Sequence, residues 1–213
     1  MMEKNRLNME VNTQRLEAFS DGVFAIAITL LILEIKIPHH EDIEKYGSLS
    51  RYLLNLWPSI FAYVFSFVII GIYWANHHHL FKLFRKTDHT FNMINVMFLM
   101  AISFLPYPTA ILGDYITDPS EGKDAVSFYA IGITLPSLFW LTMWLYAIHK
   151  GRLIDQKLKP EFVKALTKIF IVSNVIYISA IVVSFFSRNF ALAMVIIMTL
   201  IYLKSPKKPE YIE

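Results

Sequence analysis

The chain has 213 residues, a formal net charge of +3 and 55% hydrophobic residues. Only 17% of its residues are charged, against about 25% in a typical soluble domain, and its mean hydropathy is +0.46. This composition excludes a disordered, collagen-like or coiled-coil protein and favours a protein that crosses a membrane several times. The chain has no cysteine, which excludes disulfides, Cys-ligated zinc, iron–sulfur clusters and thiol nucleophiles.

The N-terminal part of the chain does not have the pattern of a signal peptide. Residues 1–17 are polar, and the first apolar run extends from Phe19 to Ile37. This run is longer than the core of a typical signal peptide, and no small-residue cleavage site follows it. We therefore expect it to be retained as a membrane span.

Apolar segments recur along the whole chain. A spanning helix needs about 20 mostly apolar residues. Six segments reach or approach this length: Glu17–Ile37, Leu53–Ala75, Phe91–Gly113, Val126–His149, Leu166–Ser187 and Asn189–Leu203. The connections between them are too short for a soluble catalytic domain.

We therefore expect an all-α, polytopic membrane protein, with residues 1–213 forming a single six-helix domain. Pro106, Pro108 and Pro136 are expected to kink the third and fourth spans.

The Lys and Arg residues between the spans indicate the orientation, because such residues gather on the cytoplasmic side of a membrane. One side receives fourteen of them: Lys4, Arg6, Arg15, Lys82, Arg85, Lys86, Lys150, Arg152, Lys157, Lys159, Lys164, Lys204, Lys207 and Lys208. The other side receives five: Lys36, Lys45, Arg51, Lys123 and Arg188. This bias predicts that both termini are cytoplasmic, in agreement with an even number of spans.

Ionisable residues are nearly absent from the interior of the spans. Apart from Asp21, near the start of the first span, no Asp, Glu, Lys or Arg lies deep inside a span. Coupled transporters usually carry such groups near the membrane midplane, and a membrane enzyme needs an acid–base pair or metal ligands. The pattern counts against both classes. A secondary transporter of a small solute or ion, and an accessory membrane protein, remain the alternatives to a channel.

The first span carries a continuous apolar stripe. At 100° per residue, the residues within about 60° of Ile26 are Phe19, Gly22, Val23, Leu30, Leu33 and Ile37. Thr29 lies at the edge of this stripe. Periodicity alone predicts that the stripe faces lipid or a neighbouring helix.

A polar cluster precedes the stripe. Arg15, Ser20 and Asp21 fall within two helical turns, where the first span begins. A carboxylate that enters a membrane span needs a partner or water. The cluster is consistent both with a functional site and with an acidic residue that is favoured by the helix dipole and tied to Arg15.

The same stretch resembles the signature of a known family. Arg15, Phe19-Ser20-Asp21 and the following Gly-Val-Phe-Ala-Ile-Ala-Ile-Thr-Leu-Leu are similar to the signature of the transmembrane protein 175 family. That family comprises lysosomal potassium channels and their prokaryotic relatives. The run from Trp74 to Phe81, Trp-Ala-Asn-His-His-His-Leu-Phe, extends the resemblance, whereas the later spans match only in general character.

The resemblance implies a potassium-selective channel without the Thr-Val-Gly-Tyr-Gly filter of the usual tetrameric potassium channels, and that motif is absent here. In the family, the first helix of each repeat lines the pore. One repeat therefore implies a homotetramer, in the inner membrane of a bacterium. The implied partners are potassium ions, the lipid bilayer and further copies of the chain. No enzymatic activity, cofactor, metal site or nucleic acid is implied.

The resemblance also implies roles for individual residues. Ile26 occupies the position that narrows the pore, and Leu30 and Leu33 continue the same apolar face. Thr29 occupies the position tied to potassium preference. Arg15, Phe19, Ser20 and Asp21 belong to the signature, and the family suggests that a polar network at the cytoplasmic end braces the pore helix.

Three adjacent histidines, His77 to His79, end the second span. Consecutive residues of a helix point about 100° apart, so these histidines cannot converge on one metal ion. The predicted topology places them at the same depth as the Arg15, Ser20 and Asp21 cluster. We therefore expect hydrogen bonds there, with His77 and His78 as candidates. Glu34, near the outer end of the first span, is either a solvated interface charge or a residue that concentrates cations at the mouth.

Overall fold

The computed structural model describes residues 2–204 and 208–212, and side chains from residue 13 onward within these ranges. These described residues form eleven helical elements: α1 (Met2–Leu30), η1 (Leu31–Glu34), α2 (His40–Tyr46), α3 (Leu49–Asn55), α4 (Trp57–Phe81), α5 (His89–Phe104), α6 (Pro106–Tyr115), α7 (Gly122–Ile148), η2 (His149–Gly151), α8 (Pro160–Ser184) and α9 (Arg188–Tyr202). The described residues form no strand beyond isolated bridges. The predicted all-α fold class is confirmed.

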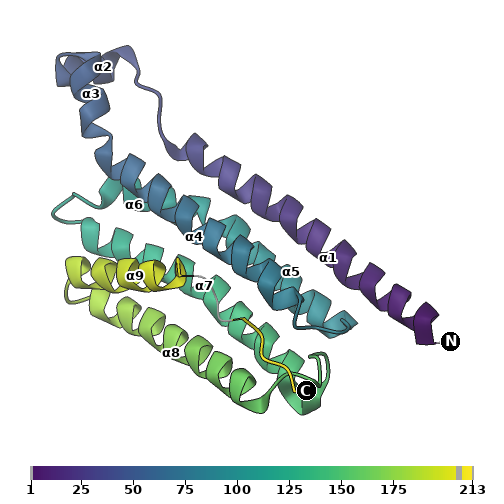
Figure 1. Cartoon of the computed structure of the whole chain (residues 1–213). Coiled ribbons are helices and arrows are strands. Elements are labelled where there is room, and N and C mark those ends of the chain that lie inside the picture. The colour runs from purple at the N-terminus through teal and green to yellow at the C-terminus, as the bar shows by residue number, and fades with distance from the viewer. Residues whose placement is uncertain (1, 205–207, 213) are drawn as a thin grey trace.

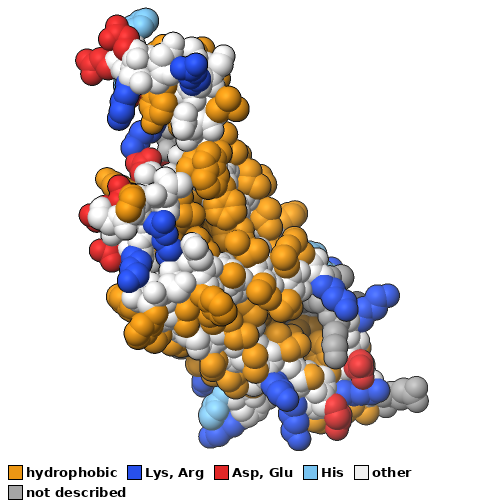
Figure 2. Space-filling model, turned by 90° about the vertical axis from the view of Figure 1, so that its left-hand side faces the viewer, with side chains coloured by type: hydrophobic (Ala, Val, Ile, Leu, Met, Phe, Trp, Pro, Cys, Tyr) orange, Lys and Arg blue, Asp and Glu red, His pale blue; other side chains and the backbone are white. Residues whose placement is uncertain are grey.

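Five helical stretches are long and apolar enough to cross a membrane: Thr13–Glu34, Trp57–Phe81, His89–Tyr115, Gly122–Gly151 and Pro160–Ser184. The sixth apolar segment forms α9, whose 15 residues extend over about 22 Å, less than the hydrocarbon core of about 30 Å. Charged side chains gather toward the two ends of the molecule, with hydrophobic surface between them (Figure 2). A polytopic membrane fold is confirmed, whereas the count of six spans stays a prediction.

Several predicted boundaries differ from the observed helices, most of all in the first three spans. α1 begins at Met2 rather than Glu17, and it ends at Leu30, where the tighter helix η1 takes over from the predicted α-helix. α4 continues to Phe81 rather than ending at Ala75, so the three histidines lie in its last two turns. The third span is divided between α5 and α6 at Pro106, which lacks the amide hydrogen that a continuous helix needs. Pro136 lies inside α7.

The helices form a bundle with α1 at one edge and α8 and α9 on the opposite side (Figure 1). α1 packs against α4 and α5, and α7 contacts α5, α6, α8 and α9. Four large side chains of α7, those of Tyr129, Ile133, Met143 and Trp144, are almost fully buried. The bundle is therefore built around α7, and α1 is held from one side only.

Two glycines allow helices to approach closely. A Cβ atom added at Gly113 of α6 would lie 2.8 Å from the Cα of Ser59 on α4. One added at Gly132 of α7 would lie 2.7 Å from the Cγ of Pro108 on α6. Both distances are well below the optimal carbon–carbon separation. Close helix packing of this kind is typical of membrane bundles, where small residues form the contact surfaces.

At one end of the bundle, the connection after α4 is joined to the connection after α7. The Arg85 amide donates a 2.8 Å hydrogen bond to the Leu153 carbonyl. Asp88, which caps α5, accepts a 2.9 Å hydrogen bond from the Tyr146 hydroxyl and lies 3.9 Å from the Arg152 guanidinium. Although burial acts to raise it, the pKa of Asp88 is lowered, because amides at the start of α5, the hydroxyl and the guanidinium favour the carboxylate. These contacts fix the end of α4 that carries the histidines.

Replacement of Gly113 by Ala is expected to destabilise the subunit, because the new methyl group overlaps with backbone that cannot yield locally. We expect a loss of about 1–3 kcal/mol, the usual cost of overpacking. The midpoint of unfolding of the purified protein in detergent measures this. Gly71→Ala is the matched control, since no atom lies within 4 Å of its added Cβ, and its stability should be unchanged or slightly higher. Equal midpoints for the two variants would contradict a close α4–α6 contact.

Candidate functional site

α1 has one buried face, which packs against α4 and α5. It consists of Ser20, Phe24 and Ala27, and Leu31 at the start of η1 continues it; each is at most 2% exposed. The intervals between these residues are four, three and four, as one face of a helix requires. Of the small residues of this helix, Ala27 lies at the contact, whereas Ala18 and Ala25 are exposed. The buried face sets the rotation of α1 about its own axis.

The other face of α1 carries the apolar stripe, and the described part of the chain leaves this stripe uncovered. The exposed fractions are 62% for Ile26, 41% for Leu30 and 71% for Leu33. Phe19 is exposed as well, and Val23 is half-buried. Leu33 lies in η1 rather than in α1, yet it remains on the exposed side. The stripe is therefore free to face lipid, a pore or another molecule.

Thr29 is exposed at the edge of this stripe. Its hydroxyl lies 2.9 Å from the carbonyl oxygens of both Ala25 and Ile26, to which it donates. A hydroxyl has one hydrogen and two acceptor sites. The hydrogen is used within the helix, so the oxygen presents only acceptor character to the surroundings.

A chain of buried hydrogen bonds joins α1, α5 and α4. The His77 Nε2–H group donates to the Asn95 side-chain carbonyl over 3.0 Å. The Asn95 amide donates to the Ser20 hydroxyl over 3.1 Å, and that hydroxyl donates to the Leu16 carbonyl over 2.8 Å. Ser20, His77 and Asn95 are at most 1% exposed. We call these three residues the buried hydrogen-bond chain.

Aromatic rings enclose the imidazole of this chain. The His77 ring centroid lies 4.2 Å from that of Phe81, 5.6 Å from that of Phe24 and 5.9 Å from that of Phe98. Phe24 belongs to α1 and Phe98 to α5. The hydrogen bonds are therefore shielded from water and lipid, where an unpaired polar group would be costly.

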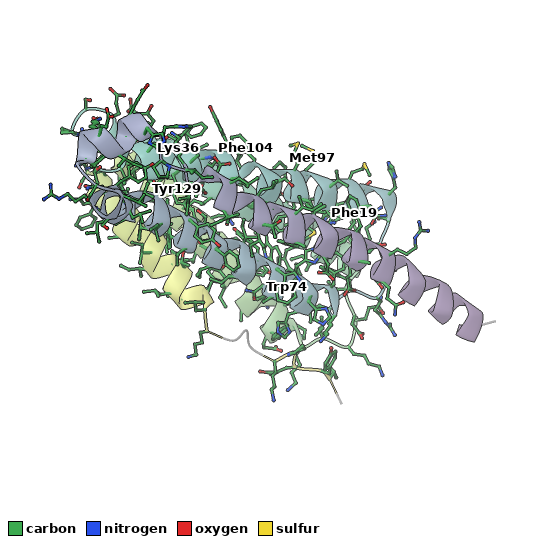
Figure 3. All side chains as sticks on the ribbon, turned by 90° about the horizontal axis from the view of Figure 1, so that it is seen from above. Phe19, Lys36, Trp74, Met97, Phe104 and Tyr129 are labelled. Carbon is green, nitrogen blue, oxygen red and sulfur yellow. The ribbon has the colours of Figure 1, made fainter. Side chains whose placement is uncertain are left out.

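Two further contacts join α1 to α4 at the surface. The indole N–H of Trp74 donates to the Asp21 carboxylate over 3.0 Å, and the Nδ1 of His78 lies 3.3 Å from the Glu17 carboxylate. Trp74 on α4 and Phe19 on α1 are labelled in Figure 3, which views the bundle from above. Asp21 thus has an indole as its partner.

The predicted network residues do not form one network: some lie in the buried hydrogen-bond chain, some in the surface contacts, and Arg15 in neither. Ser20 and His77 meet through Asn95, while Asp21 and His78 lie in the outer contacts. The guanidinium of Arg15 is exposed and has no hydrogen-bond or ion-pair partner among the described residues. His79 points elsewhere and lines a cavity beside α8. The three histidines therefore face three different surroundings.

Asn95, Trp74 and Glu17 are the participants that the sequence did not predict. Asn95 carries the one available signal, because an asparagine inside an apolar segment needs hydrogen-bond partners. Glu34 is half-buried at the end of η1 and forms no ion pair within the described part of the chain.

Sequence similarity to known proteins shows the family to which this chain belongs. A potassium channel of Chamaesiphon minutus is 45% identical over 176 residues, which cover 82% of this chain and 85% of that protein. The chain belongs to the TMEM175 family. Residues 15–106 match the family described as endosomal/lysosomal potassium channel TMEM175. The matched residues include the complete buried hydrogen-bond chain, the Asp21–Trp74 contact and the apolar stripe.

A solved structure of a TMEM175 relative has the same fold. The crystal structure of a lysosomal potassium-selective channel TMEM175 homologue from Chamaesiphon minutus matches with a TM-score of 0.80 and 38% identity. The match covers 90% of this chain and 96% of that one. Human endosomal/lysosomal proton channel TMEM175 is 34% identical over 147 residues, which cover 67% of this chain but 29% of that protein. These TMEM175 relatives are ion channels and not enzymes, as expected, and a secondary transporter is not favoured.

Replacement of Asn95 by Leu is expected to destabilise the protein, because Ser20 and His77 would each lose a partner in a buried site. A buried polar group left unpaired costs about 1–3 kcal/mol. The unfolding midpoint and the yield of assembled protein should both fall. Asn92→Leu is the control on the same helix, since its Oδ1 atom is buried without a partner among the described residues, and its loss should be neutral. If both variants are equally stable, the buried hydrogen-bond chain does not hold α1.

Proposed function

We propose that this TMEM175-family protein is a potassium channel that assembles from four copies in the inner membrane of a bacterium. The α1 helices of the four copies would surround a central pore, and both termini would be cytoplasmic. Relatives named as potassium channels support the choice of ion, including one from Streptomyces collinus that is 35% identical over 188 residues. Potassium ions and membrane lipid are the expected partners.

The two-faced character of α1 is the observation that carries this proposal. A helix that lines a shared pore must keep one face free of its own subunit and hold the other face firmly. Ile26 and Leu33 are 62% and 71% exposed, while Ser20 on the opposite side is fully buried. The buried hydrogen-bond chain provides the firm attachment.

In this proposal, Ile26 forms the narrowest ring of the pore, and Leu30 and Leu33 extend the apolar lining outward. An apolar ring obstructs ions because it cannot replace their hydration shell and tends to lose its water. Thr29 lies nearly one turn further along the helix. Its hydroxyl oxygen, which has only acceptor capacity to spare, suits a partly dehydrated cation.

The signature residues then act by orienting α1 rather than by contacting ions. Ser20 and His77 meet inside the subunit, and Asp21 is held by Trp74. A slip of α1 by one residue would turn it by about 100° and move Ile26 away from the axis. The network therefore determines which side chains face the pore.

The distribution of charge favours a channel over a coupled transporter. Among the described residues, no Asp, Glu, Lys or Arg is buried, and His77 is the one buried titratable side chain other than tyrosine. Coupling ions usually need such groups near the midplane. A channel would carry current without a coupling ion, and an accessory protein would carry none when reconstituted alone.

Ile26→Asn is expected to raise single-channel conductance severalfold and to weaken the discrimination between potassium and sodium. The reason is that a polar ring keeps its water where an apolar ring does not. Recordings from reconstituted protein in mixed potassium and sodium measure both effects. Ile32→Asn is the control, because Ile32 is 49% exposed but lies off the stripe. Unchanged conductance in Ile26→Asn, with normal assembly, would place the stripe against lipid.

Thr29→Val is expected to reduce potassium preference without opening the pore. Valine keeps the shape of the side chain and removes only the hydroxyl, whose contact with an ion is comparable to a hydrogen bond of about 0.5–1.5 kcal/mol. Reversal potentials should therefore report a few-fold fall in the potassium-to-sodium permeability ratio. The proton permeability should be measured in the same way, by changing the pH on one side, since animal relatives are named as proton channels. A variant with the selectivity of the unmodified channel would exclude Thr29 from ion contact.

Both termini are expected on the cytoplasmic side, because the ends of the bundle differ strongly in Lys and Arg content. Reporter fusions at the C-terminus that are active only in the cytoplasm test this. Activity only in the periplasm would invert the proposed orientation.

A further inference from the structure

A cavity of about 510 Å³ lies between α4, α7, α8 and α9. Figure 1 shows α8 and α9 on the side of the bundle away from α1. This volume falls within the range of about 300–1,000 Å³ that is typical of ligand sites. The wall contributed by the first half of α8 is apolar and consists of Phe162, Ala165, Leu166, Ile169 and Phe170. The site is separate from the stripe and from the buried hydrogen-bond chain.

One end of this cavity is basic. Lys82 at the end of α4, Lys204 after α9 and His79 all line it, and no Asp or Glu is among its lining residues. Lys82 and Lys204 are exposed and form no ion pair with another residue in the described ranges. By contrast, Lys159 at the same end of the bundle lies 3.7 Å from the Glu210 carboxylate. The charge at the mouth is thus available to an anion.

The depth of the apolar wall matches one leaflet of a bilayer. Phe162 and Phe170 are separated by about 12 Å along α8, close to half of a hydrocarbon core of about 30 Å. Beyond Phe170 the lining becomes polar at Ser137 and Asn174. The Asn174 Oδ1 atom is buried without a partner among the described residues, so a hydrocarbon chain should end before it and leave room for water.

We propose that this cavity binds an anionic phospholipid of the cytoplasmic leaflet, with one acyl chain along α8 and the phosphate at Lys82 and Lys204. The proposal rests on the proposed function, because a pore lined by α1 leaves α8 and α9, on the other side of the bundle, to face lipid. A small water-soluble anion would leave the apolar wall uncovered, and a neutral lipid would leave both lysines without a partner. An amphiphile with a negative headgroup covers the apolar wall with its acyl chain and pairs its charge with the two lysines.

Native mass spectrometry of the purified, delipidated full-length protein tests this proposal. Phosphatidylglycerol and phosphatidylcholine with the same acyl chains are titrated separately, and tighter binding of phosphatidylglycerol is expected. Lys82→Ala and Lys204→Ala should each reduce that preference about fivefold, the usual contribution of one basic residue to anionic lipid binding. Ala165→Trp should reduce the binding of both lipids, because Ala165 is exposed and its replacement fills the cavity without disturbing the core.

Two control variants distinguish lipid binding in the cavity from lipid binding elsewhere on the protein surface. Lys164→Ala removes an exposed charge from the same end of α8, and Val175→Trp adds an indole to an exposed position of the same helix; neither residue lines the cavity. Both variants should bind lipid as the unmodified protein does. The unfolding midpoint of Ala165→Trp should stay unchanged.

Each contrary result overturns a defined part of the proposal. A phosphatidylglycerol preference that survives both lysine replacements excludes the headgroup site, and binding that survives Ala165→Trp excludes the cavity as the location. The absence of bound lipid in the unmodified protein rejects the whole proposal. Because bound mass is measured rather than current, potassium flux of the same preparation in vesicles shows independently whether the channel function holds.

Discussion

Buried polar contacts fix the rotation of α1 about its own axis, and this rotation decides which of its side chains the bundle leaves exposed. Ser20 is fully buried and linked through Asn95 to His77. A rotation of α1 would therefore leave three polar side chains without these hydrogen bonds in apolar surroundings. Six residues separate Ser20 from Ile26, which places their side chains about 120° apart. Fixing Ser20 toward α4 and α5 therefore fixes Ile26 away from the subunit.

α4 lies between the proposed pore helix and the proposed lipid site. Its Trp74, His77 and His78 contact α1 and α5, whereas Tyr73 and His79 line the cavity beside α8. The joined connections after α4 and α7 anchor the end of this helix. One helix thus holds the proposed pore helix on one side and borders the proposed lipid site on the other.

Much of the fold follows from local sequence. Each of the six apolar segments overlaps a helix, and the stripe around Ile26 is the face that α1 leaves exposed. Periodicity shows which residues share a face, but it does not show which helix that face meets. The Asn95 contacts bridge 75 residues to Ser20 and 18 to His77, so they depend on the packing of helices distant in sequence. The change to a tighter helix after Leu30 likewise lacks a Pro or Gly to mark it.

The absence of cysteine from this chain allows the most direct test of the pore assignment. A single cysteine placed by Ile26→Cys is exposed to a small, water-soluble thiol reagent during potassium flux from vesicles. We expect the reagent to block flux in this variant and not in Ile32→Cys, because only the first thiol would lie in the proposed conducting path. Quantitative labelling of Ile26→Cys with undiminished flux would contradict a pore lined by α1.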